Sequence, residues 1–298
     1  MADVIKKVGF IGLGNMGGPM ARNLARGGFS VTGFDINATA LERAVKGGVT
    51  PADDAPSAAT DADAVITMLP DTPDALACLT GAGTALETMK PGGLVMEMST
   101  IAPAATDQIA AAARDAGLTF VDAPVGRGPA QSESAELLFM VGADDAALER
   151  ARPLFDAMGD TVIHCGAVGT GIRTKLVNNY LSQSTCQLSA EAVALGLKMG
   201  LSLDKFLPVM TGSLATNQYL ASYWKTKVLA GDIEPGFAIR LSHKDLSLAI
   251  EMAEQAGASV ATGRAARDQV GEAAEQMADQ DVSALLIAAC AKAGVEAP

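Results

Sequence analysis

A glycine-rich segment, Gly12-Leu-Gly14-Asn15-Met16-Gly17, constrains the fold of this chain more than any other feature. It follows an apolar run at residues 8–11 that predicts a strand, and a helical pattern begins near its Met16. The next apolar run, at residues 31–34, is followed directly by Asp35. A strand, a glycine turn, a helix and an acid in this order predict a Rossmann βαβ unit.

The chemistry of this unit favours a dinucleotide. Gly12, Gly14 and Gly17 allow a tight turn and a close approach of pyrophosphate to the backbone, and the helix start offers free N–H groups. A carboxylate at Asp35 accepts hydrogen bonds from ribose hydroxyls and repels a 2′-phosphate, so NAD(H) is expected. The alternative, a glycine turn with no ligand, does not explain the acid. Four more residues end later predicted strands and are expected to contact the cofactor: Met68, Leu69, Pro70 and Thr100.

The rest of the chain divides into two regions. Further short apolar runs at 64–69, 94–98, 119–122 and 137–141 alternate with helical stretches that begin near Ala38, Pro73 and Pro103. This pattern predicts a doubly wound α/β Rossmann domain over residues 1–168. Residues 172–199 contain no proline and one glycine, so they predict one long interdomain helix. Residues 202–210, 241–255 and 265–278 are also helical in pattern, and an all-α domain is expected over 169–298.

Composition excludes several classes of function. The 22 Lys and Arg against 34 Asp and Glu give a net charge of −12, and aromatic residues make up only 4%, so nucleic acid and anionic membranes are not expected partners. No apolar run is long enough for a membrane span and no leader is visible. With four scattered cysteines, the protein is expected to be soluble and cytoplasmic. Two histidines, His164 and His243, are too few for a metal site.

A polar stripe on the long helix is the candidate for chemistry. Lys175, Asn178, Asn179 and Ser182 stand at i, i+3, i+4 and i+7 and share one face. In a cleft, Lys175 would exchange a proton with a substrate oxygen and Asn179 would orient that oxygen. The same stripe on a solvated face would have no function. A Tyr223-x-x-x-Lys227 pair matches short-chain dehydrogenases, but it lies in the helical domain and is discounted.

Four separated blocks, residues 12–24, 122–128, 169–179 and 244–249, resemble the β-hydroxyacid dehydrogenase (3-hydroxyisobutyrate dehydrogenase-like) family. The resemblance implies a Rossmann domain, an all-helical domain that assembles dimers or tetramers, and hydride transfer between a hydroxyl and a carbonyl. It also implies Lys175 as acid–base group, Asn179 as its partner, and Lys244 near the nicotinamide and substrate.

One block departs from the family pattern. Members that act on carboxylates carry Ser-Gly-Gly after Asp-x-Pro-Val, whereas this chain carries Gly126-Arg127-Gly128. A guanidinium suits a permanently ionised three-oxygen anion such as a sulfonate. The segment is similar to the branch that interconverts 3-sulfolactaldehyde and 2,3-dihydroxypropane-1-sulfonate, which implies substrate contacts by Arg127 and by Asn178, Asn179 and Ser182. The alternatives are a surface role for Arg127, a small carboxylate substrate such as 3-hydroxyisobutyrate or 4-hydroxybutyrate, or a non-catalytic NAD-binding subunit.

Overall fold

The computed structural model describes residues 5–298, which form two compact units. The first ends at Lys175 and the second begins at Leu176, so the chain passes from one to the other inside helix α9 (Thr170–Lys198). The boundary expected from the sequence, between residues 168 and 169, lies just before this helix. In residues 5–298 no helix is both long enough and apolar enough to cross a membrane.

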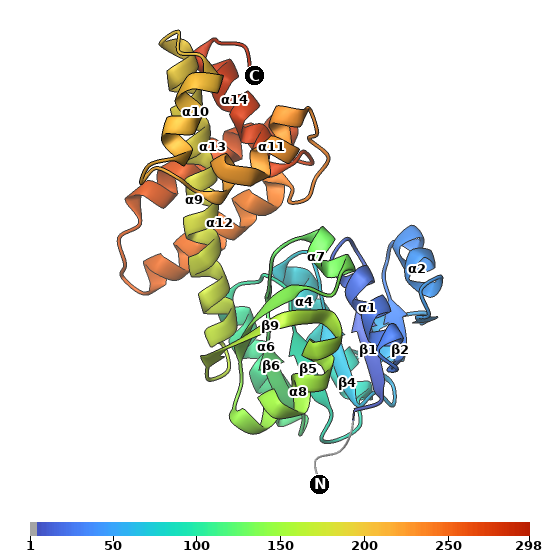
Figure 1. Ribbon diagram of the computed structural model, residues 1–298. Coiled ribbons are helices and arrows are strands. Elements are labelled where there is room, and N and C mark those ends of the chain that lie inside the picture. The colour runs from blue at the N-terminus through green and yellow to red at the C-terminus, as the bar shows by residue number, and fades with distance from the viewer. Residues whose placement is uncertain (1–4) are drawn as a thin grey trace. The chain divides into compact units, whose positions relative to one another are not determined.

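The first unit is built on a nine-stranded sheet (Figure 1). Its strand order is β3-β2-β1-β4-β5-β6-β8-β7, with β9 paired to β8. The pairs from β3 to β6 are parallel, and β8 runs antiparallel to β6 and β7. The strands are β1 (Lys7–Ile11), β2 (Ser30–Phe34), β3 (Thr50–Pro51), β4 (Ala64–Thr67), β5 (Leu94–Glu97), β6 (Thr119–Asp122), β7 (Val125–Gly126), β8 (Leu137–Gly142) and β9 (Gly159–Gly166).

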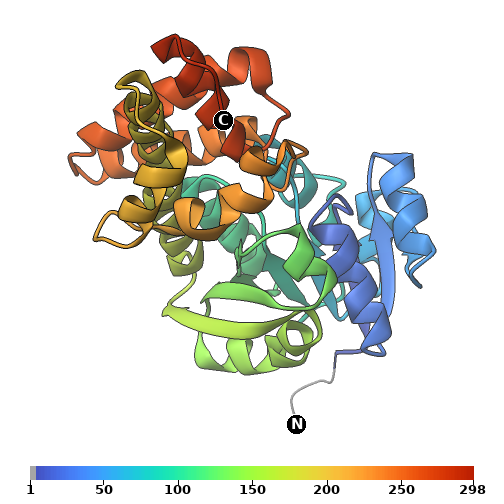
Figure 2. The same cartoon turned by 45° about the horizontal axis from the view of Figure 1, so that its top comes forward.

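Helices cover both faces of this sheet, which confirms the doubly wound Rossmann prediction (Figures 1 and 2). One face packs against α1 (Gly17–Arg26), α2 (Ala38–Val45) and α8 (Asp145–Met158) through a core that contains Phe10, Phe139 and Phe155. The other face packs against α3 (Ala55–Ala59), α4 (Thr72–Leu79), α5 (Ala85–Thr88) and α6 (Pro103–Asp115). The short helix α7 (Pro129–Glu133) lies beside α1.

The position of β1 creates the ligand edge of the sheet. Since β1 pairs with β2 on one side and with β4 on the other, the strand order reverses at β1. Loops that leave the carboxyl ends of the strands at such a reversal open a crevice where ligands bind. The glycine segment follows β1, and the predicted cofactor contacts at Met68 and Thr100 follow β4 and β5.

The second unit is helical, as predicted. Its core gathers around Trp224, Ile239, Leu246, Val270 and Leu285. Its main helices after α9 are α10 (Leu203–Thr211), α11 (Trp224–Thr226), α12 (Ile239–Gln255), α13 (Ala261–Met277) and α14 (Leu285–Ala293), with single turns at Tyr219–Tyr223, Val228–Ala230 and Val282–Ala284.

Three strands of the first unit have no signal in the sequence. β3 and β7 contain two residues each, too few for an alternating pattern. β9 has eight residues, but none of them is buried, so its sequence lacks the apolar alternation that marks a strand against a core. The six strands that were predicted all have buried apolar residues.

Candidate active site

The loop between β1 and α1 has the shape that a pyrophosphate needs. Gly12 has a φ of +92°, and a Cβ there would collide with the Met68 carbonyl oxygen, while a Cβ at Gly17 would collide with the Gly12 carbonyl oxygen. A Cβ at Gly14 would meet no atom within 4 Å. Gly12 and Gly17 are therefore required by close packing, whereas Gly14 leaves the backbone open to a ligand at the start of α1. This backbone fits a bound dinucleotide.

Asp35 follows β2 and is fixed by two backbone donors. Its Oδ2 accepts a hydrogen bond from Leu13 N at 2.6 Å, and its Oδ1 accepts one from Asn37 N at 2.7 Å. The carboxylate is thus tied to the glycine loop, and its remaining lone pairs are able to accept the two ribose hydroxyls. Its negative charge at this position disfavours the 2′-phosphate of NADP.

The neighbouring strand ends are tied to one another. Leu69 N, after β4, donates to Ser99 Oγ, after β5, at 2.8 Å. The Met16 carbonyl oxygen accepts a hydrogen bond from Ser132 Oγ at 2.8 Å, and Asn15 is exposed. The sheet therefore brings the predicted cofactor contacts Met68, Leu69, Pro70 and Thr100 to one edge.

Two buried acids lie below this edge, and no sequence pattern marked either of them as functional. Glu97 and Asp122 are register partners at the ends of β5 and β6, and each is 1% exposed. Burial raises the pKa of Glu97 to about 7 and that of Asp122 to about 6. Asp122 accepts hydrogen bonds from Gly169 N at 2.6 Å and Ile172 N at 2.8 Å, and so it caps the start of α9.

Lys175 and Arg127 are both linked to the short strand β7 of the first unit. The Lys175 Nζ donates to the Val125 carbonyl oxygen at 2.8 Å, which holds the ammonium at β7. Arg127 follows β7 with a φ of +71°, and its guanidinium forms an ion pair with Asp160 at 2.7 Å. The predicted proton donor and the predicted anion-binding residue therefore belong to adjacent parts of the same unit.

Asn178 and Asn179 of the polar stripe on α9 belong to a chain of hydrogen bonds in the second unit. Asn178 Nδ2 donates to Asn179 Oδ1 at 3.0 Å, and Asn179 Nδ2 donates to Asp245 Oδ2 at 2.6 Å. Lys244 Nζ lies 3.4 Å from Asp245 Oδ1. Asn179 and Asp245 are buried, so the stripe is not simply a solvated face. Nothing in the sequence marked Asp245 as the partner of Asn179.

Ser182 stands apart from this chain, because its hydroxyl hydrogen-bonds with the Tyr219 hydroxyl at 2.9 Å. Lys175 and Asn179 are one turn apart on α9. The roles of Lys175, Arg127, Asn178, Asn179, Ser182 and Lys244 stay predictions.

The residues of the discounted tyrosine–lysine motif, and His164, each contact other residues of the protein. Tyr223 donates to Asp281 Oδ2 at 2.7 Å, while Lys227 pairs with Asp232 at 2.8 Å, so they do not form an activated tyrosine–lysine pair. His164 Nε2 lies 2.9 Å from the Ala143 carbonyl oxygen. Within residues 5–298 there is no cluster of three or more His, Cys, Asp or Glu that could hold a metal.

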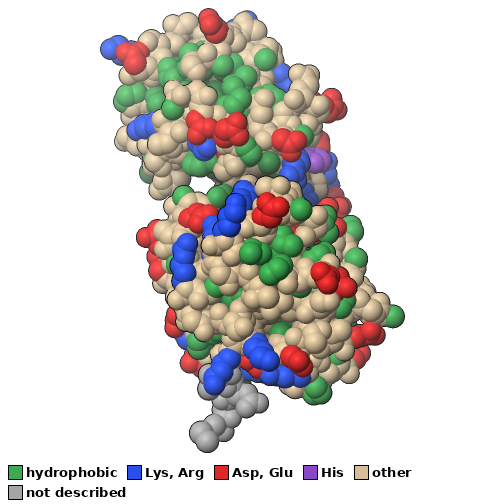
Figure 3. Space-filling model, turned by 90° about the vertical axis from the view of Figure 1, so that its right-hand side faces the viewer, with side chains coloured by type: hydrophobic (Ala, Val, Ile, Leu, Met, Phe, Trp, Pro, Cys, Tyr) green, Lys and Arg blue, Asp and Glu red, His purple; other side chains and the backbone are tan. Residues whose placement is uncertain are grey.

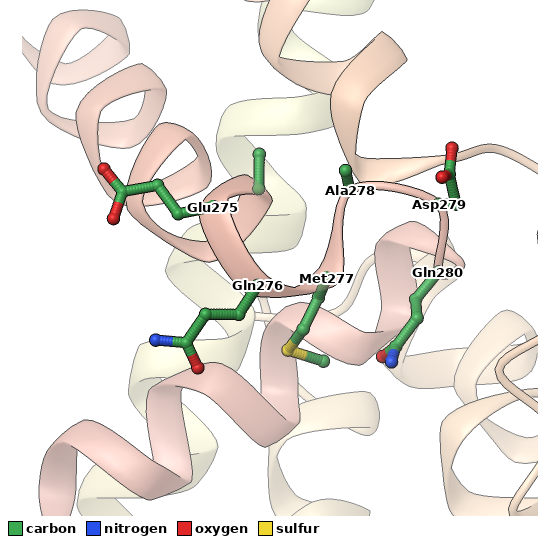
Figure 4. A pocket seen from close by; sticks show the side chains of 7 residues that line it. Glu275, Gln276, Met277, Ala278, Asp279 and Gln280 are labelled. Carbon is green, nitrogen blue, oxygen red and sulfur yellow. The ribbon is translucent and has the colours of Figure 1, made fainter.

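The hollow drawn in Figure 4 is not a substrate site. It has a volume of about 330 Å³ and is lined by a single segment, the end of α13 and the turn after it, residues 274–280. The side chains of Glu275 and Asp279 extend to opposite sides of this segment. A binding site needs polar groups that converge, and here they diverge. On the face shown in Figure 3, Lys and Arg side chains are interspersed with Asp and Glu.

Comparisons with known proteins agree with this geometry. Residues 7–166 match the model of the NAD-binding domain of 6-phosphogluconate dehydrogenase, and residues 169–289 match the model described as NAD-binding of NADP-dependent 3-hydroxyisobutyrate dehydrogenase. The chain is 40% identical to 3-sulfolactaldehyde reductase of Escherichia coli K12 over 97% of its own length and 98% of the relative. It is also 40% identical to an NAD-dependent L-serine dehydrogenase of Pseudomonas aeruginosa, over 87% of its own length and 89% of the relative.

A solved structure leads to the same family. The 3-hydroxyisobutyrate dehydrogenase of Mycobacterium tuberculosis, solved with L-serine, is 35% identical and superposes with a TM-score of 0.88, covering 95% of this chain and 99% of that one. The family resemblance found in the sequence is thereby confirmed. The chain belongs to the β-hydroxyacid dehydrogenase family, which includes 3-hydroxyisobutyrate dehydrogenase, and it is an NAD-dependent oxidoreductase that acts on a hydroxyl group.

Proposed function

We propose that this enzyme interconverts 3-sulfolactaldehyde and 2,3-dihydroxypropane-1-sulfonate. The observation that carries the proposal is the placement of Arg127 directly after β7, the strand whose Val125 carbonyl holds Lys175. A proton-donating ammonium at one end of a short strand and a guanidinium at the other suit a three-carbon substrate with a carbonyl and a strong anion. The 40% identity with 3-sulfolactaldehyde reductase over nearly the whole chain supports the same substrate.

Lys175 is the acid–base group in this proposal. Bound NAD(H) supplies or accepts the hydride. The hydrogen bond to Val125 O fixes the direction of the Lys175 ammonium, which donates a proton to the aldehyde oxygen and recovers it when the alcohol is oxidised. Asn179, one turn further along α9 and held by Asp245, orients the substrate oxygen, and Lys244, whose Nζ lies 3.4 Å from Asp245 Oδ1, would contact the nicotinamide and the substrate. Asn178 and Ser182 complete the substrate contacts.

A small carboxylate is the second candidate substrate. The relatives include an L-serine dehydrogenase at 40% identity and probable 3-hydroxyisobutyrate dehydrogenases at 37% identity. A carboxylate accepts hydrogen bonds from a guanidinium as well as a sulfonate does. The tripeptide Gly126-Arg127-Gly128 favours the sulfonate over the carboxylate substrate. It supplies a positive charge, whereas family members that use carboxylates supply a serine hydroxyl in this tripeptide. A non-catalytic NAD-binding subunit has no use for an ordered Lys175.

The test compares substrates on the purified enzyme. NAD⁺ reduction is followed at 340 nm with 2,3-dihydroxypropane-1-sulfonate, 3-hydroxyisobutyrate, 4-hydroxybutyrate and L-serine. We expect kcat/KM for the sulfonate to exceed that of each carboxylate at least tenfold, about 1.4 kcal/mol in transition-state binding. Lys175→Ala is expected to reduce kcat by roughly 10²–10⁴-fold while NADH still binds. A preference for a carboxylate would overturn the sulfonate proposal, and an active Lys175→Ala variant would overturn the mechanism.

We also propose that the enzyme is a homodimer or homotetramer. Leu181, Leu188 and Leu195 stand seven residues apart on α9, and each is more than 60% exposed. A row of exposed leucines at two-turn spacing is typical of a helix that packs against another helix. A hollow of about 310 Å³ between α9, α13 and α14 borders the same row at Leu195. A second copy of this chain is the partner that such a face fits.

A further inference from the structure

The Arg127 guanidinium donates hydrogen bonds to three protein acceptors, one just before β8 and two in β9. Its Nη1 donates to the Glu136 carbonyl oxygen, just before β8, and to Asp160 Oδ1 in β9 at 2.7 Å. Its Nη2 donates to Thr161 Oγ1 at 3.1 Å. The Thr161 hydroxyl also donates to Asp160 Oδ1 at 2.7 Å, so the three side chains form a closed ring of hydrogen bonds. These contacts fix the plane of the guanidinium.

One edge of that guanidinium is left for a ligand. Of its five N–H groups, three reach Glu136, Asp160 and Thr161; Nε–H and the second Nη2–H have no acceptor in residues 5–298. These two N–H groups point in parallel along the same edge, the arrangement that grips two oxygens of one anion. The Arg127 side chain as a whole is 35% exposed, so the protein does not enclose it completely.

The backbone of Arg127 is also unusual. Its φ of +71° lies in the left-handed region, where a residue with a side chain is disfavoured by about 1–2 kcal/mol relative to glycine. Glycine would adopt this conformation at no steric cost. Unfavourable backbone at one residue is typical of functional sites, where the side chain itself is needed.

The position of this edge suits the proposed reaction. Val125, which holds the Lys175 ammonium at 2.8 Å, precedes Arg127 by two residues, so their Cα atoms are within about 7 Å of each other. Hydrogen bonds from Thr161 and from Arg127 lower the pKa of Asp160 below its ordinary value, which keeps it ionised beside the guanidinium. Asp160 is therefore ionised at neutral pH and keeps its ion pair with Arg127.

We propose that Asp160, together with Thr161, is a positioning residue for substrate recognition: it holds Arg127 so that its Nε–Nη2 edge receives the anionic group of the substrate. This inference rests on the proposed function, because it needs a substrate with an anion, but it does not depend on whether that anion is a sulfonate or a carboxylate. Asp160 itself does not touch the substrate.

The test is a set of variants assayed with charged and uncharged alcohols. Asp160→Asn is expected to raise KM for 2,3-dihydroxypropane-1-sulfonate roughly fivefold, in the range of one exposed ion pair, with kcat and the KM for NAD⁺ unchanged. Its kcat/KM for 1,2-propanediol, which has no anion, should equal that of the wild type. Thr161→Val should raise KM for the sulfonate less than Asp160→Asn does. Thr161→Ser, which keeps the hydroxyl, should have the wild-type KM.

Arg127→Gly is the reference variant, because glycine suits the left-handed backbone and we therefore expect the fold to be retained. It should raise KM for the sulfonate more than Asp160→Asn does, and adding Asp160→Asn to it should have no further effect. Glu149→Gln, which removes the exposed Glu149–Arg152 pair on α8, is the matched control and should change nothing.

The outcomes separate this inference from the proposed function. If Arg127→Gly raises KM while Asp160→Asn leaves it unchanged or lowers it, Asp160 is a bystander or a competitor of the substrate, and the positioning role is wrong. If Arg127→Gly also leaves KM unchanged, the inference falls with the anion site. If the wild type prefers 3-hydroxyisobutyrate, the sulfonate proposal fails, and the same variants read on that carboxylate still decide the role of Asp160.

Discussion

At the scale of single residues, Asp245 supports the amide that orients the substrate oxygen in the proposed mechanism. Asp245→Ala would leave the buried Asn179 Nδ2 without its acceptor, which costs about 1–3 kcal/mol in free energy of unfolding. Asp245→Asn keeps an acceptor oxygen and should lose less than half as much. Urea unfolding followed by circular dichroism measures both, and Glu251→Ala, at an exposed position of the same helix, is the control. Equal losses in the two Asp245 variants would contradict this account.

Residues that belong to a motif of fixed spacing were predictable, and those that depend on distant partners outside any motif were not. Gly12, Gly17 and Asp35 stand at the fixed spacings of the dinucleotide-binding motif, so spacing alone pointed to them. Asp245 meets Asn179 across 66 residues, and Asp160 meets Arg127 across 33. No periodicity encodes such pairs, because they exist only once β9 and α12 have packed.

At the scale of elements, the long helix α9 shows the same division. Its length followed from the absence of proline over residues 172–199, because proline is the strongest interruption of a helix. Its anchors came from elsewhere in the chain: Asp122 at the end of β6 caps its first turn, and Asp107 of α6 pairs with Arg173 at 2.7 Å. Both hold the turn that carries Lys175, and neither could be inferred from the helix's own sequence.

The buried Glu97 at the end of β5 leads us to expect that stability depends on pH. Burial raises the pKa of Glu97 to about 7 from an ordinary value of 4.5, so the folded protein keeps this proton at pH values where the unfolded chain has lost it. The free energy of unfolding therefore falls as pH rises from about 4.5 to about 7. Glu97→Gln removes the ionisation and should be more stable than the wild type at pH 8, by on the order of 3 kcal/mol, with the difference vanishing near pH 4. Denaturation at both pH values tests this, and a constant difference would contradict it.

At the scale of the whole molecule, alternation of short apolar runs with helical stretches was enough to predict a doubly wound sheet followed by a helical region, because each strand buried on both faces is a continuous apolar run. β7 and β9 escaped prediction because they are short or unburied. They are also the strands that hold Val125, Asp160 and Thr161, so the part of the fold that we propose for substrate recognition is the part with the weakest sequence pattern.

The exposed row of leucines on α9 leads to a prediction about assembly. If Leu188 and Leu195 lie in an interface between copies, two glutamates there would bury charges without partners and would dissociate the assembly. The wild type is expected to have two or four times the chain mass of 30.3 kDa in light scattering after gel filtration, and Leu188→Glu/Leu195→Glu a lower multiple. Val45→Glu, at an exposed apolar position of α2, should keep the wild-type mass. A wild-type mass of one chain, or a double variant that still assembles, would show that this face is not the interface.

Assembly should also affect activity, because the same helix carries Lys175 and Asn179, the residues of the proposed mechanism. If the interface stiffens α9, loss of assembly should lower kcat. Activity measured across a dilution series of the wild type tests this coupling without any substitution.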